Sequence, residues 1–219
     1  MGDKVVKPMP LKPPARTDAA EPGAATLLER QLRDGPSSAP ATALDAFKLA
    51  RRRFFAGERV DMSSIAAEIG VNRVTLYRWV GTREQLLTEV IWSLAQRTLD
   101  LARARAAATG GERVAQVVAG FIDAVINNEG WRRQIAEEGE LTMRLLTRSE
   151  GGFQPRMIAA FRELLAEEAD IGHLDVPVEL DDLAYAVARI AESYVYRELI
   201  TGQPPDARGA EQILRLLLR

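Results

Sequence analysis

Residues 61–86 read DMSSIAAEIGVNRVTLYRWVGTREQL, the most informative stretch of the sequence. It predicts two short helices separated by a tight turn. Ser63 and Ser64 supply hydroxyl groups at the start of the first helix, where they can cap free backbone N–H groups. Gly70 readily adopts the left-handed conformation that ends a helix, and Asn72 is a good N-cap for the second helix.

The second helix of this stretch has an inner and an outer face. Leu76 and Val80 lie four residues apart and therefore point inward together. A basic helix face is usually only a solvated surface. Here, however, it occurs together with capped helices, a glycine turn and an inward apolar pair, which is typical of a helix-turn-helix motif. The outer face carries Val74, Thr75, Tyr77 and Arg78.

The charge distribution indicates a polyanionic partner for this region. Residues 41–88 carry eight basic and five acidic side chains, whereas residues 89–219 carry 15 basic and 21 acidic ones. A short basic block ahead of a longer acidic body suggests that one part of the chain meets a polyanion and the rest does not.

The composition excludes most enzyme chemistry. Among 219 residues there is no cysteine and one histidine, His173, so thiolate nucleophiles and two-imidazole mechanisms are excluded. No phosphate-binding GxxxxGK or dinucleotide-binding GxGxxG motif occurs. We therefore expect no enzyme activity, no cofactor and no metal site. No apolar run is long enough to span a membrane and no secretory signal is evident, so we expect a cytoplasmic protein.

The whole chain is predicted to be all-α. Residues 1–40 contain seven of the 11 prolines, which predicts a largely disordered arm with a possible short helix over 24–33. Beyond residue 40, apolar residues recur at three- and four-residue spacings, which predicts about nine helices. These cover 42–56, 63–69, 73–80, 82–107, 112–127, 131–148 (divided near Gly139), 154–169, 180–200 and 208–218. The expected inward residues include Leu44, Leu101, Ile213, Leu216 and Leu217.

The helix-turn-helix stretch resembles the DNA-binding domain of tetracycline-repressor-like (TetR family) regulators. Matching residues are Ile65-Ala66, Gly70-Val71, Thr75-Leu76-Tyr77, Arg83-Glu84 and Leu86-Leu87, with Ala46, Phe54 and Gly57 upstream. Trp79 and Val80 depart from the usual family residues. The resemblance implies an N-terminal three-helix helix-turn-helix DNA-binding domain over 41–84. It also implies a six-helix ligand-binding and dimerisation body over 85–219.

The resemblance also implies how this domain binds a double-stranded DNA operator. Arg73, Val74 and Arg78 are placed to reach base edges in the major groove, where arginine pairs with guanine and valine contacts a thymine methyl. The run 51–53, three arginines, is either a further DNA contact or a solvated face. Phosphate contacts, which position the protein on DNA, are implied for Ser63, Thr75, Tyr77, Trp79 and Arg83.

In this family the body encloses an effector pocket, and the last two helices pair with those of a second subunit to form a homodimer. Apolar contacts to the effector are expected from Phe121, Trp131 and Phe161. Arg189, Glu192 and Tyr196 form a polar line at i, i+3 and i+7 on an apolar helix. This line is either a solvent edge or a polar wall in which Arg189 and Tyr196 orient the ligand.

The segment RIAESYVYRELITGQPPD around this polar line resembles a subgroup of actinobacterial regulators that control lactone-degradation genes. A small, mostly apolar effector, such as an acyl chain or a γ-lactone, is therefore expected to release the operator from a repressor. The long helix from Thr82 is expected to transmit the change. The alternative is a TetR-like DNA-binding protein without a small-molecule effector, controlled by a protein partner or acting architecturally. An enclosed apolar cavity distinguishes the two.

Overall fold

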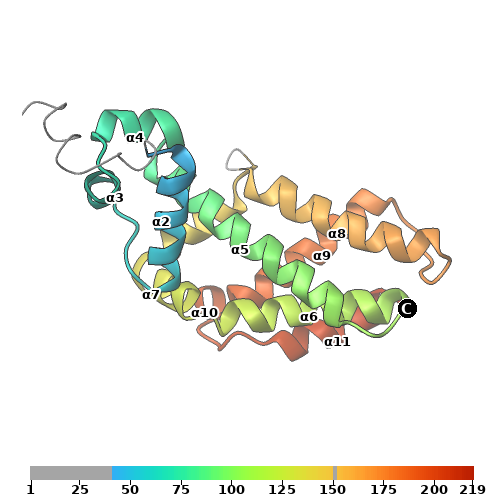
Figure 1. The fold of residues 1–219 in the computed structure, drawn as a ribbon. Helices are drawn as coiled ribbons and strands as arrows, with labels where there is room; N and C mark the ends of the chain where they lie inside the picture. Colours follow the sequence, from blue (N-terminus) through green and yellow to red (C-terminus); the bar gives the residue numbers. More distant parts are fainter. Residues whose placement is uncertain (1–40, 150–151) are drawn as a thin grey trace, which may run out of the picture. The chain divides into compact units, whose positions relative to one another are not determined.

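Ten α-helices make up the regular structure of the residues that the computed structural model describes, 41–149 and 152–219. No strand occurs in these residues, so the all-α prediction is confirmed. The helix expected over 24–33 lies outside the described residues. The helices, labelled as in Figure 1, are α2 (Ala43–Phe55), α3 (Met62–Glu68), α4 (Arg73–Val80), α5 (Arg83–Arg105), α6 (Gly110–Ile126), α7 (Glu129–Thr147), α8 (Phe153–Asp170), α9 (Leu180–Val195), α10 (Arg197–Thr201) and α11 (Ala207–Leu217).

Polar N-caps fix where several helices begin. Asn72 caps α4, as the sequence predicts, because its side chain accepts a hydrogen bond from the backbone N–H of Thr75 at 2.7 Å. The prediction that Ser63 and Ser64 cap α3 is wrong. Asp61 is the N-cap and accepts from the backbone N–H of Ser64 at 2.8 Å. The carboxylate one residue before the helix reaches this orphan N–H, whereas both serines already lie within the first turn.

Helices α2, α3 and α4 gather at one end of the described unit (Figure 1). The turn between α3 and α4 uses Gly70 at φ 72°, a left-handed conformation that favours glycine. Ile65 and Leu76 have no exposed surface, and Phe54 is buried with them. Burial of one face of each short helix gives these helices a stability that they would lack in isolation.

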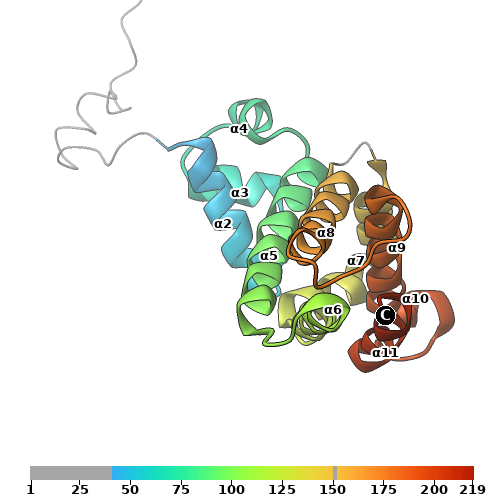
Figure 2. The ribbon, with the colours of Figure 1, turned by 90° about the vertical axis from the view of Figure 1, so that its right-hand side faces the viewer.

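Helices α5 to α11 form the body of the described unit. α5 begins directly after α4 and runs away from it, and α6 packs on both α5 and α11. α8 packs on α9, and Figure 2 shows α9 and α11 on the same side of the body. α7 is kinked at Glu138, where the backbone leaves helical geometry, close to the predicted division at Gly139. No helix within the described ranges combines the length and apolarity needed to cross a bilayer.

Several local predictions differ from the structure. The helix expected over 180–200 ends at Val195 and α10 follows Tyr196, so the body has one helix more than expected. The core of α11 is formed by residues four apart, Ala210, Leu214 and Leu218. The residues expected inward but found exposed are Leu44, Leu101, Ile213, Leu216 and Leu217.

Candidate DNA-binding surface and effector cavity

The outer face of α4 is open to solvent over its whole length. Val74 is 78% exposed, and Arg73 and Arg78 are exposed beside it. The Arg73 guanidinium lies 5.9 Å from the centre of the Tyr77 ring, which orients both side chains. The three residues predicted to contact base edges therefore lie together on one short α-helix. An α-helix fits into the major groove of DNA.

The residues predicted to bind phosphate lie in three settings. Tyr77 is exposed on α4, with Thr75 and Trp79 half-buried on the same helix. Ser63 is exposed near the start of α3. Arg83 lies apart from these residues, at the first position of α5.

The guanidinium of Arg83 is occupied by contacts within the protein. Its Nε donates to the carbonyl oxygen of Val60 at 2.6 Å. Its Nη2 donates to both carboxylate oxygens of Glu138 at 2.8 and 3.1 Å. Burial opposes ionisation of Glu138, but hydrogen bonds from Arg83 and Gln134 outweigh it and hold the pKa of this carboxyl below its ordinary value. Arg83 therefore joins the helix-turn-helix to the kink of α7, and its predicted phosphate contact stays a prediction.

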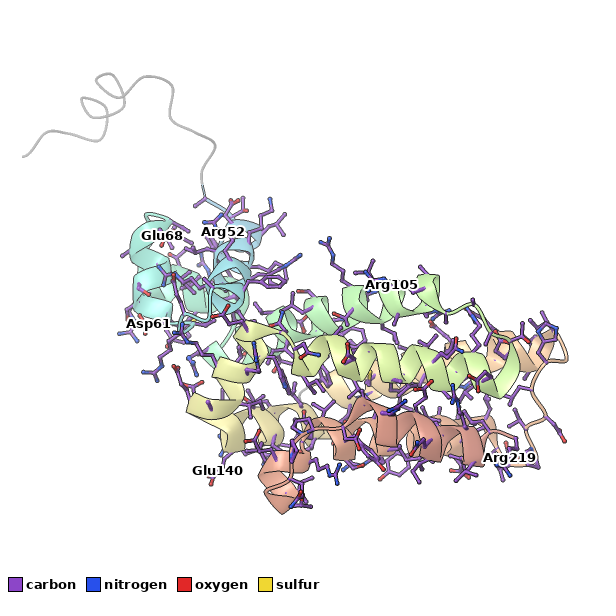
Figure 3. The ribbon with its side chains drawn as sticks, turned by 90° about the horizontal axis from the view of Figure 1, so that it is seen from below. Arg52, Asp61, Glu68, Arg105, Glu140 and Arg219 are labelled. Atoms are coloured by element: carbon purple, nitrogen blue, oxygen red, sulfur yellow. The ribbon has the colours of Figure 1, made fainter. Side chains whose placement is uncertain are left out.

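One residue of the arginine run on α2, Arg53, is engaged within the protein. Arg53 donates to Ser64 and, at 2.5 Å, to Glu68 of α3. Arg52 lies 3.8 Å from the same carboxylate, but 72% of its side chain is exposed; both residues are labelled in Figure 3. The contacts of Arg53 tie α2 to α3, and a DNA contact from the rest of the run stays a prediction.

A cavity of about 310 Å³ lies in the body and is lined almost entirely by apolar side chains. Helices α2 and α5 to α9 all contribute to its wall. Exposed residues such as Arg97 and Leu101 lie at its outer part, whereas Phe161 and Ala188 have no exposed surface. The lining residues include Phe54, Phe55, Ile91, Leu94, Ala95, Arg97, Leu101, Phe121, Val125, Trp131, Leu146, Phe153, Met157, Phe161, Ala188, Ala191, Glu192 and Tyr196.

Four of the five residues predicted to contact an effector line this cavity: Phe121, Trp131, Phe161 and Tyr196. The rings of Phe121 and Phe161 meet edge to face, with centroids 6.3 Å apart. Burial raises the pKa of Tyr196 well above its ordinary value, so its hydroxyl is neutral and can donate. The fifth residue, Arg189, is outside the lining, half-exposed, and donates to Glu192 at 2.5 Å.

Two functional features of the cavity were not predicted from the sequence. Glu192 belongs to the lining, whereas the predicted polar contact was its neighbour Arg189. The polar line at i, i+3 and i+7 was the signal that could have found it. Phe54 and Phe55 of α2 also line the cavity. That contact joins residues far apart in sequence, and no local pattern indicates it.

Helix α2 is in close contact with the start of α7. A Cβ atom added at Gly130 would lie 2.2 Å from the carbonyl oxygen of Phe54, so only glycine allows this approach. Arg133 donates to the carbonyl oxygen of Gly57 at 3.1 Å. Helix α7, which contributes to the cavity wall, therefore packs directly against α2 of the DNA-binding region.

Comparison with known proteins agrees with this arrangement. Residues 109–219 match the family model described as tetracyclin repressor-like, C-terminal domain. No curated protein sequence matches the chain. The TetR-family transcriptional repressor QsdR of R. erythropolis is 28% identical with a TM-score of 0.74, over 80% of this chain and 93% of that chain.

A second structure shows the same fold. The TetR-family repressor AlkX from Dietzia sp., implicated in biodegradation of n-alkanes, is 20% identical with a TM-score of 0.57, over 83% of this chain and 97% of that chain. Both of these proteins are described as TetR-family repressors. The family model covers half of the chain, and the chain therefore belongs to the TetR family of transcriptional regulators.

Proposed function

We propose that this protein is a ligand-responsive transcriptional repressor. It binds a DNA operator and releases it when a small, mostly apolar effector enters the cavity. The observation that carries the proposal is the apolar cavity of about 310 Å³, which falls in the size range of small-molecule sites. Its wall includes Phe54 and Phe55, so a bound molecule would touch the helix that supports the DNA-binding motif. A solid core would have favoured control by a protein partner.

We assign DNA binding to residues 41–84 and the effector and dimer functions to residues 85–219. On α4, Arg73, Val74 and Arg78 are proposed to contact base edges, because their side chains are exposed on one face. Ser63, Thr75, Tyr77 and Trp79 are proposed to hold phosphates, which fixes the orientation of α4 without reading sequence.

The homodimer is proposed to form through α9 and α11. Tyr185 on α9 is 55% exposed, and Ile213, Leu216 and Leu217 leave an apolar surface on α11. Large apolar side chains exposed on adjacent helices are typical of a subunit interface. Two-fold symmetry would place the two α4 helices in successive major grooves, about 34–36 Å apart or a multiple of that, so the operator would be palindromic.

Selection of bound DNA from a random pool tests the DNA-binding half of the proposal. We expect a palindrome whose half-sites are separated by a whole number of helical turns. Recovery of an asymmetric site bound by a single subunit would contradict the proposed dimer.

Effector response is tested with decanol and γ-decalactone, which represent an aliphatic chain and a γ-lactone. We expect at least one to bind the protein and release the selected DNA. Ala124 is exposed and lines the cavity, so Ala124→Trp should obstruct the cavity with little effect on folding. Ala159→Trp, at another exposed alanine that lies outside this lining, is the control. Failure of both compounds to bind would favour the alternative, a regulator controlled by a protein partner.

A further inference from the structure

One buried carboxyl group lies in the described wall of the cavity, that of Glu192. Among the described residues that line the cavity, the only other charged side chain is that of Arg97, which is exposed on α5. Glu192 is only 7% exposed and is surrounded by apolar lining residues. Burial of a carboxylate costs free energy unless opposite charges and hydrogen bonds offset it, so the contacts of Glu192 decide what it can still bind.

The carboxylate is held from behind by two side chains. Gln154 donates to Oε1, and the same amide nitrogen donates to the backbone carbonyl of Leu146 at 2.8 Å, which fixes it. Arg189 donates to Oε2 at 2.5 Å, and its own side chain is 44% exposed and does not line the cavity. The donors on the protein side therefore approach from outside the cavity.

These contacts leave acceptor capacity on the Glu192 carboxylate, which belongs to the cavity lining. A carboxylate has about four lone-pair sites, and the two contacts to Gln154 and Arg189 use two of them. A molecule in the cavity can use the remaining acceptor sites only if it donates a hydrogen bond. A ligand carboxylate placed beside the ionised form of Glu192 would instead meet a like charge.

We propose that Glu192 recognises the buried polar end of the effector, and that this end is a hydrogen-bond donor, such as an ammonium, an amide N–H or a hydroxyl, and not a carboxylate. This inference rests on the proposed function, since it requires that the cavity holds the effector. It names a specificity residue and a chemical class: aliphatic molecules with a donor at the inner end.

The protonation of Glu192 gives this preference a pH dependence. Burial raises the pKa of the carboxyl from its ordinary value of 4.5 to about 7, against the lowering effect of Arg189. Tyr196, which lines the cavity beside Glu192, stays neutral because burial raises its pKa. Ionisation of Glu192 above this pKa therefore strengthens the attraction for an ammonium, whereas an alkylammonium stays protonated throughout.

Calorimetric titration of the full chain with decylamine, decanol and decanoate tests the proposal, since these probes share one chain and differ in their head group. We expect decylamine to bind most tightly and decanoate least. Glu192→Gln keeps the shape of the side chain and should reduce the advantage of decylamine over decanol by about tenfold or more. Glu163→Gln, an exposed carboxylate on α8, should leave all three affinities unchanged.

The pH dependence of the unmodified protein provides a second test that does not depend on a variant folding. The ratio of decylamine to decanol affinity should rise from about pH 6 to about pH 8. Equal binding of decylamine and decanoate, or an unchanged ratio in Glu192→Gln, would overturn the role of Glu192 while leaving the effector cavity intact. Absence of binding by all three probes would instead refute the cavity's proposed function together with this inference.

Discussion

The contact between Arg83 and Glu138 should be measurable as a coupling between the two side chains. One guanidinium donates to both carboxylate oxygens at 2.8 and 3.1 Å, and the side chains are only 20% and 17% exposed. Hydrogen bonds to charged groups contribute about 1.5–3 kcal/mol, whereas fully exposed ion pairs contribute about 0.2–1 kcal/mol. This partly buried pair lies between these limits, so we expect a coupling of about 1–2 kcal/mol.

A double-mutant cycle in urea isolates that coupling. Arg83→Ala should cost more than Glu138→Ala, because it also removes the 2.6 Å hydrogen bond to the carbonyl oxygen of Val60. The double variant should be more stable than the sum of the two losses implies, by about 1–2 kcal/mol. Arg148→Ala, an exposed arginine just after α7, is a control that should show no coupling to Glu138. A coupling below about 0.5 kcal/mol would refute the reasoning.

Acid should remove the same coupling. The folded-state pKa of Glu138 is lowered from its ordinary value of 4.5, so its contribution to stability is complete above that value and is lost as the pH falls below it. DNA binding provides an independent check on Arg83. A guanidinium that stays on Glu138 predicts an unchanged salt dependence in Arg83→Ala, whereas a phosphate contact predicts a slope shallower by about one unit.

Three further substitutions test other parts of the structure. Arg78→Ala should relax the preference at particular bases by about 1–3 kcal/mol each; a selected motif identical to that of the unmodified protein would exclude base reading by this residue. Gly130→Ala should lower the free energy of unfolding by about 1–3 kcal/mol, because its Cβ would lie 2.2 Å from a backbone carbonyl oxygen. Its control, Gly120→Ala on the exposed side of α6, should raise the free energy of unfolding by about 0.5–1 kcal/mol. Asn72→Ala should cost about 1 kcal/mol in thermal unfolding and weaken binding to all DNA sequences, and full retention of both would mean that the cap of α4 is dispensable.

Helix positions and the helix-turn-helix could be predicted because their signals are local. These signals act within one or two turns of helix. Asn72 caps α4, Gly70 adopts the left-handed turn and Leu76 points inward, as expected. The inner face of α11 could not be predicted from composition alone. Its last turns are apolar at several successive positions, and only packing against α6 and α9 selects Leu214 over Ile213.

The cavity and its contacts with the helix-turn-helix depend on pairs that are distant in sequence. Glu138 follows Arg83 by 55 residues, and no periodicity relates them. The approach of Gly130 to the backbone of Phe54 is set by the packing of α7 on α2. The polar line was visible in sequence, but packing decides which of its members line the cavity, and these are Glu192 and Tyr196 but not Arg189.

These distant contacts alter the expected route from effector to DNA. The sequence points to the long helix from Thr82 as the transmitting element, whereas the structure connects the cavity to the DNA-binding helices in two further ways. Phe54 lines the cavity from α2 itself. Trp131 lines it from α7, and Glu138, about two helical turns further along α7, binds Arg83 at the kink. A ligand shifts an equilibrium only through contacts that differ between two states. Side chains that touch both the cavity and the helix-turn-helix are therefore the positions where an effector can exert that difference directly.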